Sequence, residues 1–158
     1  MTETVGVPEL RLIHTGLVCR DMDAAQSQLA STLGVHWVGG QPEPWTLTLF
    51  GEKREVTLRI AHACLGDSAY ELIEAKANTP WLTEADIAQH HLCFHSSEPA
   101  QSCAALEQQG FTRIMGAKGD ATGYFRDPDG LLIEIIDDGL LGYLEHYYQQ
   151  SRQRADAL

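Results

Sequence analysis

The fold is decided by RLIHTGLVCRDMDAAQSQLASTLGVHWV (residues 11–38), which returns in altered form as AQHHLCFHSSEPAQSCAALEQQGFTRIM (residues 88–115). Each copy begins with an apolar, strand-like run that carries a histidine. A polar turn and about one helix rich in Ala, Gln, Leu and Ser follow. Both helices end at a glycine, which takes the left-handed conformation without steric cost. The chain therefore contains an internal repeat, offset by 77 residues at the histidines.

Three short runs of strand-forming residues follow each predicted helix. They lie at 46–50, 55–63 and 69–75 in the first half, and at 112–115, 122–126 and 131–137 in the second. The DPDG stretch is a turn signal between the last two runs. Each half is therefore predicted to be a βαβββ module, and two modules make an α+β fold with eight strands. The tail at 138–153 predicts a further helix that closes an open end of the core.

Length and composition predict one domain, with module one at about 10–76, module two at about 86–137 and the C-terminal helix at about 138–153. A net charge of −11 disfavours nucleic acid as a partner. No apolar run is long enough to span a membrane. The four cysteines form no CxxC pair and are expected to be free thiols, and the N-terminus has no signal-peptide pattern. We expect a cytoplasmic protein.

Strand alternation divides the three histidines of AQHHLCFH between two faces. His90 shares a face with Leu92, an expected core anchor against the following helix. His91 lies on the opposite face with Cys93 and His95, toward the space that the sheet encloses. Only one of the three histidines is thus a strong candidate for a ligand.

The repeat pairs His91 with His14, and the last strand of each half adds a glutamate, Glu71 in AYELIEA and Glu134 in LLIEIID. A carboxylate in such an apolar run is costly to bury unless a cation or hydrogen-bond donors compensate it. Any one of the four has an ordinary explanation as a structural or exposed residue. Four at repeat-equivalent positions predict a site of two imidazoles and two carboxylates for one divalent ion, such as Zn, Ni, Co, Fe(II) or Mn.

The chain resembles the vicinal oxygen chelate superfamily in its βαβββ repeat and in the stretches IHTGLVCRDMDAA, YELIEA, HHLCF and YFRDPDGLLIEIID. This superfamily includes glyoxalase I, methylmalonyl-CoA epimerase, extradiol dioxygenases and the bleomycin- and fosfomycin-resistance proteins. The resemblance covers residues 11–137. It implies a cup-shaped cleft between the modules, a homodimer, and a metal ion held by His14, Glu71, His91 and Glu134.

The resemblance also implies a chemistry. A metal-bound substrate with vicinal oxygens is activated by the Lewis acid, and a carboxylate beside the ion moves a proton next to a carbonyl through an enolate-type intermediate. Glu134 is the first candidate for the base, with Glu71 as its partner. We therefore expect a metal-dependent isomerase, epimerase or lyase acting on a small oxygenated carbonyl or thioester substrate. The first repeat looks most similar to the methylmalonyl-CoA epimerase branch.

Other functions stay open at this point. One is a non-catalytic protein that sequesters a small molecule, and another is a scaffold with a vestigial metal site. An extradiol-type dioxygenase is disfavoured, because such enzymes use a 2-His-1-carboxylate triad and Glu71 fills one of the remaining positions. The epimerases are similar in carrying a further acid on the third strand, where this chain has Thr57.

Five residues are candidate substrate contacts: Thr57, Arg59, Cys93, His95 and Tyr124. Arg59 shares the expected face of Thr57 and is a candidate for binding a substrate carboxylate. Cys93 and His95 share the face of His91. Cys93 is not expected to be a nucleophile, because no flanking base or cation lowers its pKa. His62 is expected to be a surface or structural residue.

Overall fold

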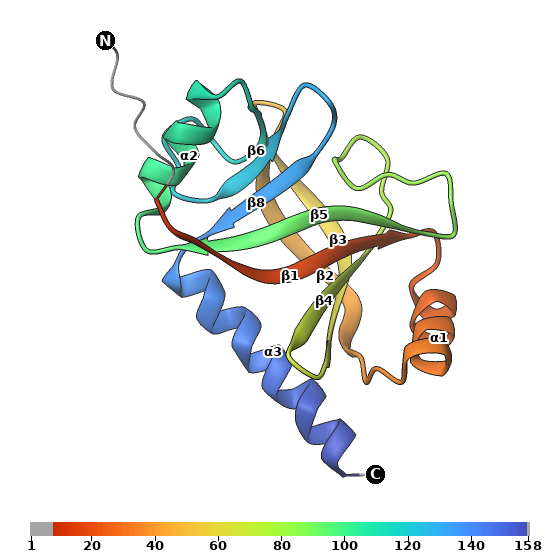
Figure 1. Ribbon diagram of the computed structural model, residues 1–158. Coiled ribbons are helices and arrows are strands. Elements are labelled where there is room, and N and C mark those ends of the chain that lie inside the picture. Colours follow the sequence, from red (N-terminus) through yellow and green to blue (C-terminus); the bar gives the residue numbers. More distant parts are fainter. Residues whose placement is uncertain (1–7, 158) are drawn as a thin grey trace.

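The structure is a computed structural model that describes residues 8–157, which form eight strands and three helices (Figure 1). In chain order the elements are β1 (Leu10–Cys19), α1 (Met22–Leu33), β2 (Val38–Leu49), β3 (Glu52–Leu65), β4 (Ser68–Glu74), β5 (Ile87–Ser96), α2 (Pro99–Gln108), β6 (Thr112–Met115), β7 (Gly123–Arg126), β8 (Leu132–Ile136) and α3 (Asp138–Asp156). The predicted α+β fold with two βαβββ modules and a C-terminal helix is confirmed. β2 begins earlier than expected and α3 ends later.

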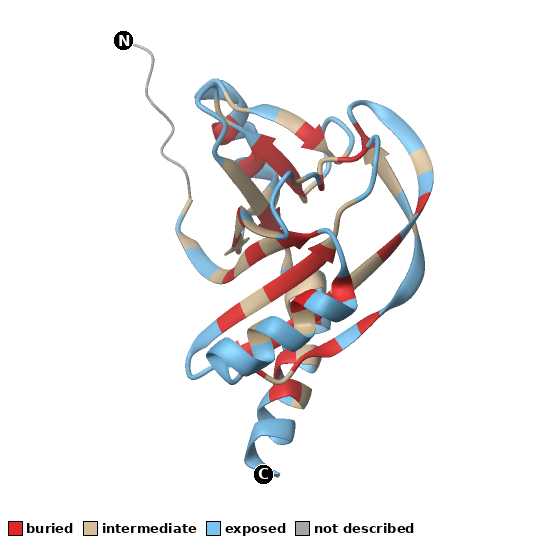
Figure 2. Ribbon diagram, turned by 90° about the vertical axis from the view of Figure 1, so that its right-hand side faces the viewer, coloured by how far each residue is buried: buried red, intermediate tan, exposed pale blue. Residues whose placement is uncertain are grey.

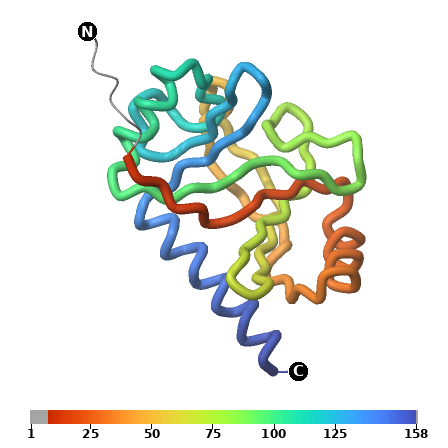
Figure 3. Tube along the Cα trace, in the orientation of Figure 1, coloured from red at the N-terminus to blue at the C-terminus, as the bar shows by residue number. Residues whose placement is uncertain are grey.

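The eight strands form one closed barrel in the order β1-β4-β3-β2-β6-β7-β8-β5. In each module the first strand lies parallel to the last one, so β1 pairs with β4 and β5 with β8. The two first strands also pair with each other, antiparallel, and run side by side in the barrel wall, red and green in Figure 3. β8, β5, β1 and β4 are therefore consecutive neighbours, and they carry the four predicted ligands.

The second contact between the modules is narrow. β2 and β6 pair only through Leu49 and Met115 among the described residues. The outer edge of β2 is otherwise free, which accommodates Pro42 and Pro44, because a proline has no N–H to donate to a neighbouring strand. The barrel is thus firmly closed on the β1–β5 side and loosely closed opposite.

The first two helices cover the outside of their own modules. Asp21 caps α1 by accepting a hydrogen bond from the Ala24 N–H at 2.8 Å, and Gly34 ends the helix at φ 74°. α2 begins at Pro99, a favoured first residue because its missing N–H would have no partner there. Its buried side packs Leu106 against the outer face of β7 and β8.

α3 covers one end of the barrel, the role expected for it. The Asp137 carboxylate caps the helix by accepting from the Leu140 N–H at 2.9 Å. Leu144 and Tyr148 then pack on Cys93 and Ile136 from the barrel strands. The last turns extend beyond the barrel and are exposed (Figure 2).

All four cysteines are buried and unpaired, as expected for free thiols. Within residues 8–157, no helix combines the length and apolar character that crossing a bilayer requires.

Candidate metal centre

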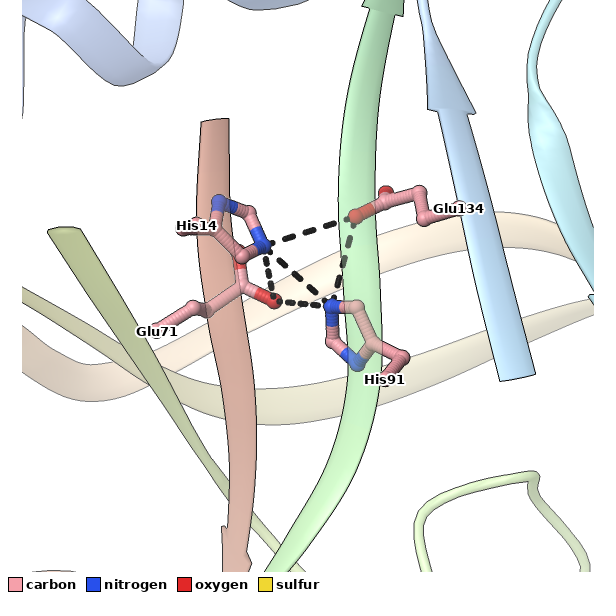
Figure 4. Close-up of side chains that lie close together, drawn as sticks. All are labelled: His14, Glu71, His91 and Glu134. Carbon is pink, nitrogen blue, oxygen red and sulfur yellow. Dashed lines mark hydrogen bonds and ion pairs between the residues drawn. The ribbon is translucent and has the colours of Figure 1, made fainter. Parts of the chain in front are cut away.

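Four side chains from the two modules meet inside the barrel (Figure 4). His14 of β1, Glu71 of β4, His91 of β5 and Glu134 of β8 each direct one potential ligand atom to a common point, and these atoms lie within 4.8 Å of one another. We call these four residues the His–Glu cluster. His14, Glu71 and His91 are buried, and Glu134 is half-buried. One chain supplies all four.

The spacing of these atoms fits a metal ion. The two Nε2 atoms of His14 and His91 lie 3.2 Å apart. From His91 Nε2 the distances to Glu71 Oε1 and Glu134 Oε1 are 3.5 and 3.4 Å, and from His14 Nε2 they are 3.7 and 3.6 Å. Neighbouring ligands on a metal with bonds of about 2.1 Å lie roughly 3.0–3.4 Å apart. Glu134 Oε1 is also buried without a hydrogen-bond partner, as expected for an oxygen that serves as a metal ligand.

A cavity of about 160 Å³ borders the cluster, and Glu71, Glu134 and His62 contribute to its lining. The remaining walls are mostly apolar and aromatic. They come from the first module and the following linker (Trp45, Leu47, Leu58, Ile60, Ile73, Trp81), from the second module (Met115, Thr122, Tyr124, Ile136), and from α3 (Leu140, Tyr143, Leu144). The His–Glu cluster therefore faces a largely apolar cavity, the usual setting of a small-molecule site.

Comparison of the sequence with known protein families identifies the superfamily of this chain. A sequence model of the glyoxalase/bleomycin resistance protein/dioxygenase superfamily matches residues 13–125. The chain belongs to this superfamily. No curated protein sequence matches it significantly.

Solved structures with the same fold include methylmalonyl-CoA epimerases. One in complex with methylmalonyl-CoA and ammonium is 20% identical, with a TM-score of 0.55 over 80% of this chain and 93% of its own. A variant of the Streptomyces coelicolor enzyme in complex with 2-nitronate-propionyl-CoA is 20% identical, with a TM-score of 0.56 over 84% and 95% of the two chains. The Mycobacterium tuberculosis epimerase is 18% identical, with a TM-score of 0.54 over 83% and 91%. At such identities the likeness concerns the superfamily fold.

Within this superfamily fold, a hydrogen-bond chain orients His91. His90 Nε2 lies 2.8 Å from the Pro80 carbonyl oxygen, which only accepts, so the proton of His90 is on Nε2. Burial, aided by the charge of His91, lowers the pKa of His90 to about 4 and keeps it neutral. His90 Nδ1 is then an acceptor for the Nδ1–H of His91 at 2.8 Å. This leaves His91 Nε2 as the ring atom that faces the cluster.

His14 has an equivalent partner from α3. Its Nδ1 lies 2.7 Å from the Tyr148 hydroxyl, while its Nε2 faces the cluster. With the proton on Nδ1, His14 donates to Tyr148 Oη and presents a lone pair on Nε2. Outer partners of this kind fix the tautomer of a metal-binding histidine. Tyr148 and His90 were not predicted from the sequence, because one lies in the distant C-terminal helix and the other on the assumed core face of β5.

The hydrogen-bond chain from the Pro80 carbonyl through His90 to His91 predicts an effect of the substitution His90→Phe. The ring shape is retained, but the Nδ1–H of His91 loses its acceptor, so we expect divalent-metal affinity to fall about 10- to 100-fold. His90→Asn offers a carbonyl oxygen near the former Nδ1 and should recover most of this loss. Zinc affinity measured by competition with a chelator tests both variants. Equal zinc affinities of His90→Phe and the wild type would contradict a role of this hydrogen-bond chain in metal binding.

Gly16 makes room for His91. The two residues face each other across β1 and β5, and a Cβ added to Gly16 would lie 2.1 Å from His91 Cε1. The imidazole thus occupies the space that any larger residue at position 16 would need. A register irregularity of β1 adjoins Gly16 and locally bends the strand.

Gly16→Ala should therefore displace His91 and weaken metal binding by about 10- to 100-fold, by analogy with the loss of an outer-shell partner. Gly142→Ala is the matched control, because nothing lies within 4 Å of the new Cβ on α3. That control should keep the metal and stabilise the helix by about 0.5–1 kcal/mol. Chelator competition and thermal unfolding separate the two outcomes. A Gly16→Ala protein with normal metal affinity would show that His91 has other room to move.

The cluster carries strongly interacting charges. Burial disfavours the charged form of His91, but the nearby carboxylates of Glu134 and Glu71 outweigh it and raise the pKa of His91 to about 9. Burial likewise opposes ionisation of Glu134, yet the imidazoles of His14 and His91 hold its pKa well below the usual range. The pKa of Glu71 is lowered for the same reason. The carboxylates are therefore ionised and His91 is protonated at neutral pH when no cation is present.

This charge state predicts pH-dependent metal uptake. A metal must displace the proton from His91 Nε2, so the apparent zinc affinity should fall about tenfold for each pH unit below 9 and level off above it. Chelator competition between pH 6.5 and 9.5 measures this slope. An affinity that does not change between pH 7 and 8.5 would show that no proton is released from the site.

The predicted orientation of Thr57 and Arg59 is wrong. Thr57 is exposed, and its carbonyl oxygen accepts from Lys76. Arg59 lies on the outside of the barrel, where it pairs with Asp23 at 2.7 Å and with Glu74 at 3.5 Å. The alternate residues of β3, such as Leu58 and Ile60, face the cavity. The outward partners of Arg59 are on α1 and on β4, the neighbouring strand of the same module.

Cys93 and His95 do not line the cavity either. Cys93 was predicted to face the cleft with His91, but it packs with Ile136 and Leu144 beneath α3. Burial and the charge of Glu134 raise the pKa of its thiol well above the ordinary value, so it stays protonated, in agreement with the prediction that it is no nucleophile. His95 Nε2 bonds to Asp138 Oδ1 at 2.7 Å, at the start of α3.

Tyr124 does line the cavity, and its hydroxyl accepts a hydrogen bond from Trp81 Nε1 at 3.2 Å. His62 is a cavity residue that sequence reasoning missed. Its Nδ1 lies 3.9 Å from Glu71 Oε2, and its ring packs on Tyr147 with 4.8 Å between ring centroids. The alternation of Leu58, Ile60 and His62 in TLRIAHA was a usable signal, because these three residues share one face.

Proposed function

We propose that the chain is a metal-dependent isomerase, epimerase or lyase acting on a small oxygenated carbonyl or thioester compound. The observation that carries this proposal is the convergence of four ligand atoms, two nitrogens and two oxygens, at the wall of an apolar cavity. A mixed shell of imidazole and carboxylate suits a borderline divalent ion. The fold shared with methylmalonyl-CoA epimerases supports an isomerase of this general kind.

In this proposal, His14, Glu71, His91 and Glu134 hold the ion. A divalent cation supplies Lewis-acid stabilisation for negative charge that develops on a substrate oxygen. Tyr148 and His90 hold the two imidazoles in the tautomers that ligation needs. The apolar walls exclude bulk water, which strengthens the electrostatic interactions inside.

We assign the base to Glu134. Its Oε1 is buried, has no hydrogen-bond partner, and belongs to a residue that lines the cavity. Glu134 takes a proton from the carbon next to the substrate carbonyl. Glu71 reaches the same cavity from β4, the strand at the other edge of the four-strand set. A proton removed by one carboxylate and returned by the other inverts the carbon between them.

A second candidate is a small-molecule binding protein of the same fold. The cavity-facing residues of β3 are Leu58, Ile60 and His62, none of which is a carboxylate. The resemblance to the epimerases implies an acid on this strand, so its absence from the cavity face favours binding without turnover. The two candidates predict different outcomes for proton exchange.

The test combines metal analysis with hydrogen exchange. Purified protein should retain about one divalent ion per chain after passage over a desalting column. The zinc-loaded protein is then incubated in deuterated water with 2-hydroxycyclohexanone or with methylmalonyl-CoA, and loss of the α-proton is followed by NMR. Exchange above the rate given by free zinc supports the enzyme. Metal retention without exchange of either compound supports the binding protein, and absence of metal overturns both metal-dependent proposals.

The homodimer and the cytoplasmic location remain predictions. Because one chain supplies all four residues of the His–Glu cluster, the proposed site needs no residue from a partner subunit. Light scattering during size-exclusion chromatography measures the mass of the assembly, and about 17.4 kDa would contradict the dimer.

A further inference from the structure

The cavity beside the His–Glu cluster is half-open, and its partly exposed lining flanks a gap in the barrel wall. β2 and β6 share a single residue pair among the described residues, so the wall is split along most of β2. Trp45 and Leu47 border this gap from β2, and Met115 and Thr122 border it from the second module. Glu71, at the cluster, is buried. The cavity therefore has an inner end at the candidate metal ligands and a mouth between β2 and the second module.

Arg54 lies on the inner face of the barrel beside this mouth. In the pairing of β3 with β2 it is directly opposite Leu47, which lines the cavity. Directly opposed residues of an antiparallel pair project from the same face of the sheet. Alternation along β3 gives the same result, because Val56 and Leu58 belong to the interior core. A long cationic side chain is therefore placed next to the mouth of a largely apolar cavity.

The charge of Arg54 has no counter-charge within residues 8–157. Its guanidinium donates from Nη2 to the carbonyl oxygen of Asn78, which is neutral, and its Nε is buried without a hydrogen-bond partner. A half-buried cation and a buried N–H that lack partners both cost free energy. Arg59 and Arg113 differ, because carboxylates outside the barrel pair with them. Arg54 thus offers a ligand both a free donor and an uncompensated charge.

A second unused donor lies on the same face. Trp45 Nε1 is buried and makes no hydrogen bond. Trp45 is opposite Val56 and is therefore the diagonal neighbour of Arg54 across β2 and β3. Diagonal neighbours lie within reach of long and aromatic side chains. Two N–H donors and one positive charge match a carboxylate, which offers two acceptor oxygens and one negative charge. A phosphate dianion would leave one charge uncompensated.

This position is far from the carboxylates of the His–Glu cluster. His62 is opposite Glu71 and lies eight positions along β3 from Arg54, or roughly 26 Å at about 3.3 Å per residue. Repulsion between exposed charges is largely screened beyond about 8 Å in physiological salt. An anionic group at the mouth is therefore compatible with Glu71 and Glu134 at the inner end. A ligand that reaches both ends must be extended.

We propose that the substrate is an extended carboxylic acid, and that Arg54 and the indole N–H of Trp45 bind its carboxylate at the mouth of the cavity. The apolar middle of the ligand packs on Leu47 and Met115, which line the mouth. The assignment rests on the proposed function only for the other end of the substrate, which would react at the His–Glu cluster. Binding of the carboxylate at Arg54 needs no metal.

The test compares an acid with its neutral amide. Zinc-loaded protein is titrated calorimetrically with 3-phenylpropionate and with 3-phenylpropanamide, which share the same apolar group. We expect the wild type to bind the acid at least about tenfold more tightly than the amide, and Arg54→Met to lose this preference. Arg59→Met is the matched control on the outer face of β3 and should keep it. A preference for the acid that survives in Arg54→Met would come from the metal and would overturn the assignment.

A spectroscopic measurement on the wild-type protein covers the case in which Arg54→Met does not fold. The Nε–H signal of Arg54 in nitrogen-edited NMR spectra is identified by its absence from Arg54→Lys, which keeps the charge. This signal should shift on addition of 3-phenylpropionate and stay in place with the amide. An unchanged signal at saturating acid overturns the assignment.

Two further outcomes are distinct. Tighter binding of 2-phenylethyl phosphate than of 3-phenylpropionate would overturn the choice of a carboxylate. Protein that holds no zinc, yet prefers the acid through Arg54, would refute the proposed function and support the carboxylate site. Zinc-loaded protein without that preference would refute only the carboxylate site.

Discussion

His91→Ala is expected to lower the affinity for a divalent ion by more than about 100-fold, since changes in the outer shell alone cost 10- to 100-fold. The substitution removes the residue that lies 3.2 to 3.5 Å from the other three members of the His–Glu cluster. It also leaves two buried carboxylates with one fewer cationic partner. We expect the purified variant to contain almost no zinc when the wild-type protein contains about one ion per chain.

His95→Ala is the matched control for this prediction. His95 is on the same strand, but it bonds Asp138 at the start of α3 and does not border the cavity. It should retain zinc at the wild-type level. Similar zinc contents in His91→Ala and the wild type, measured on folded protein, would exclude the cluster as the metal site.

The arrangement of the candidate ligands was accessible from the sequence because the chain repeats itself. Two modules with the same element order place equivalent strands side by side, so His14 and His91 had to lie near each other if the first strands paired. The observed antiparallel pairing of β1 and β5 satisfies that condition. Glu71 and Glu134 follow because each last strand lies parallel to its module's first strand. Local pattern and repeat symmetry therefore sufficed to predict the cluster.

The orientation of β3 was not predicted correctly, for a reason that lies in the barrel. A strand of a closed barrel has an inner face that needs apolar residues even when no helix covers its outer face. Leu58 and Ile60 fill the interior, while Arg59 is held outside by charged groups of other elements. Thr57 was predicted to face the cleft because of the resemblance to the epimerases, and the alternation of apolar and polar residues along the strand was given less weight. The strand's own pattern was the better guide.

The course of α3 could not be predicted from its amphipathic pattern. The pattern indicated a helix with one apolar side, but not which strands it would contact. In the structure α3 brings Tyr148 to His14, adds Tyr143 to the cavity wall, and covers Cys93. These contacts join residues more than 50 positions apart, and they depend on where the barrel leaves an apolar end uncovered. The prediction that His95 lines the cleft was wrong because the sequence did not show that Asp138, at the start of α3, would lie beside it.

Glu134→Gln is expected to slow proton exchange strongly while leaving the metal bound. The amide has nearly the same shape and keeps an oxygen that can ligate, so metal affinity should fall less than in His91→Ala. An amide cannot accept the α-proton as a carboxylate does. Loss of a general base typically costs 10²- to 10⁴-fold, and we expect deuterium incorporation into 2-hydroxycyclohexanone to slow by about that factor at saturating zinc.

Glu71→Gln separates the role of base from that of metal ligand, because both glutamates belong to the cluster but only Glu134 has the unpartnered buried oxygen. With Glu71 as the partner that returns the proton on the opposite face, this variant should still exchange the α-proton of 2-hydroxycyclohexanone, while interconversion of its enantiomers slows. NMR follows the exchange, and chiral chromatography follows the interconversion. If Glu134→Gln, fully loaded with zinc, exchanged protons within a few-fold of the wild-type rate, Glu134 would be a metal ligand without a role in proton transfer. If only Glu71→Gln lost the exchange, the base would be Glu71 of β4 instead of Glu134. Both carboxylates reach the cavity, from opposite edges of the same four strands.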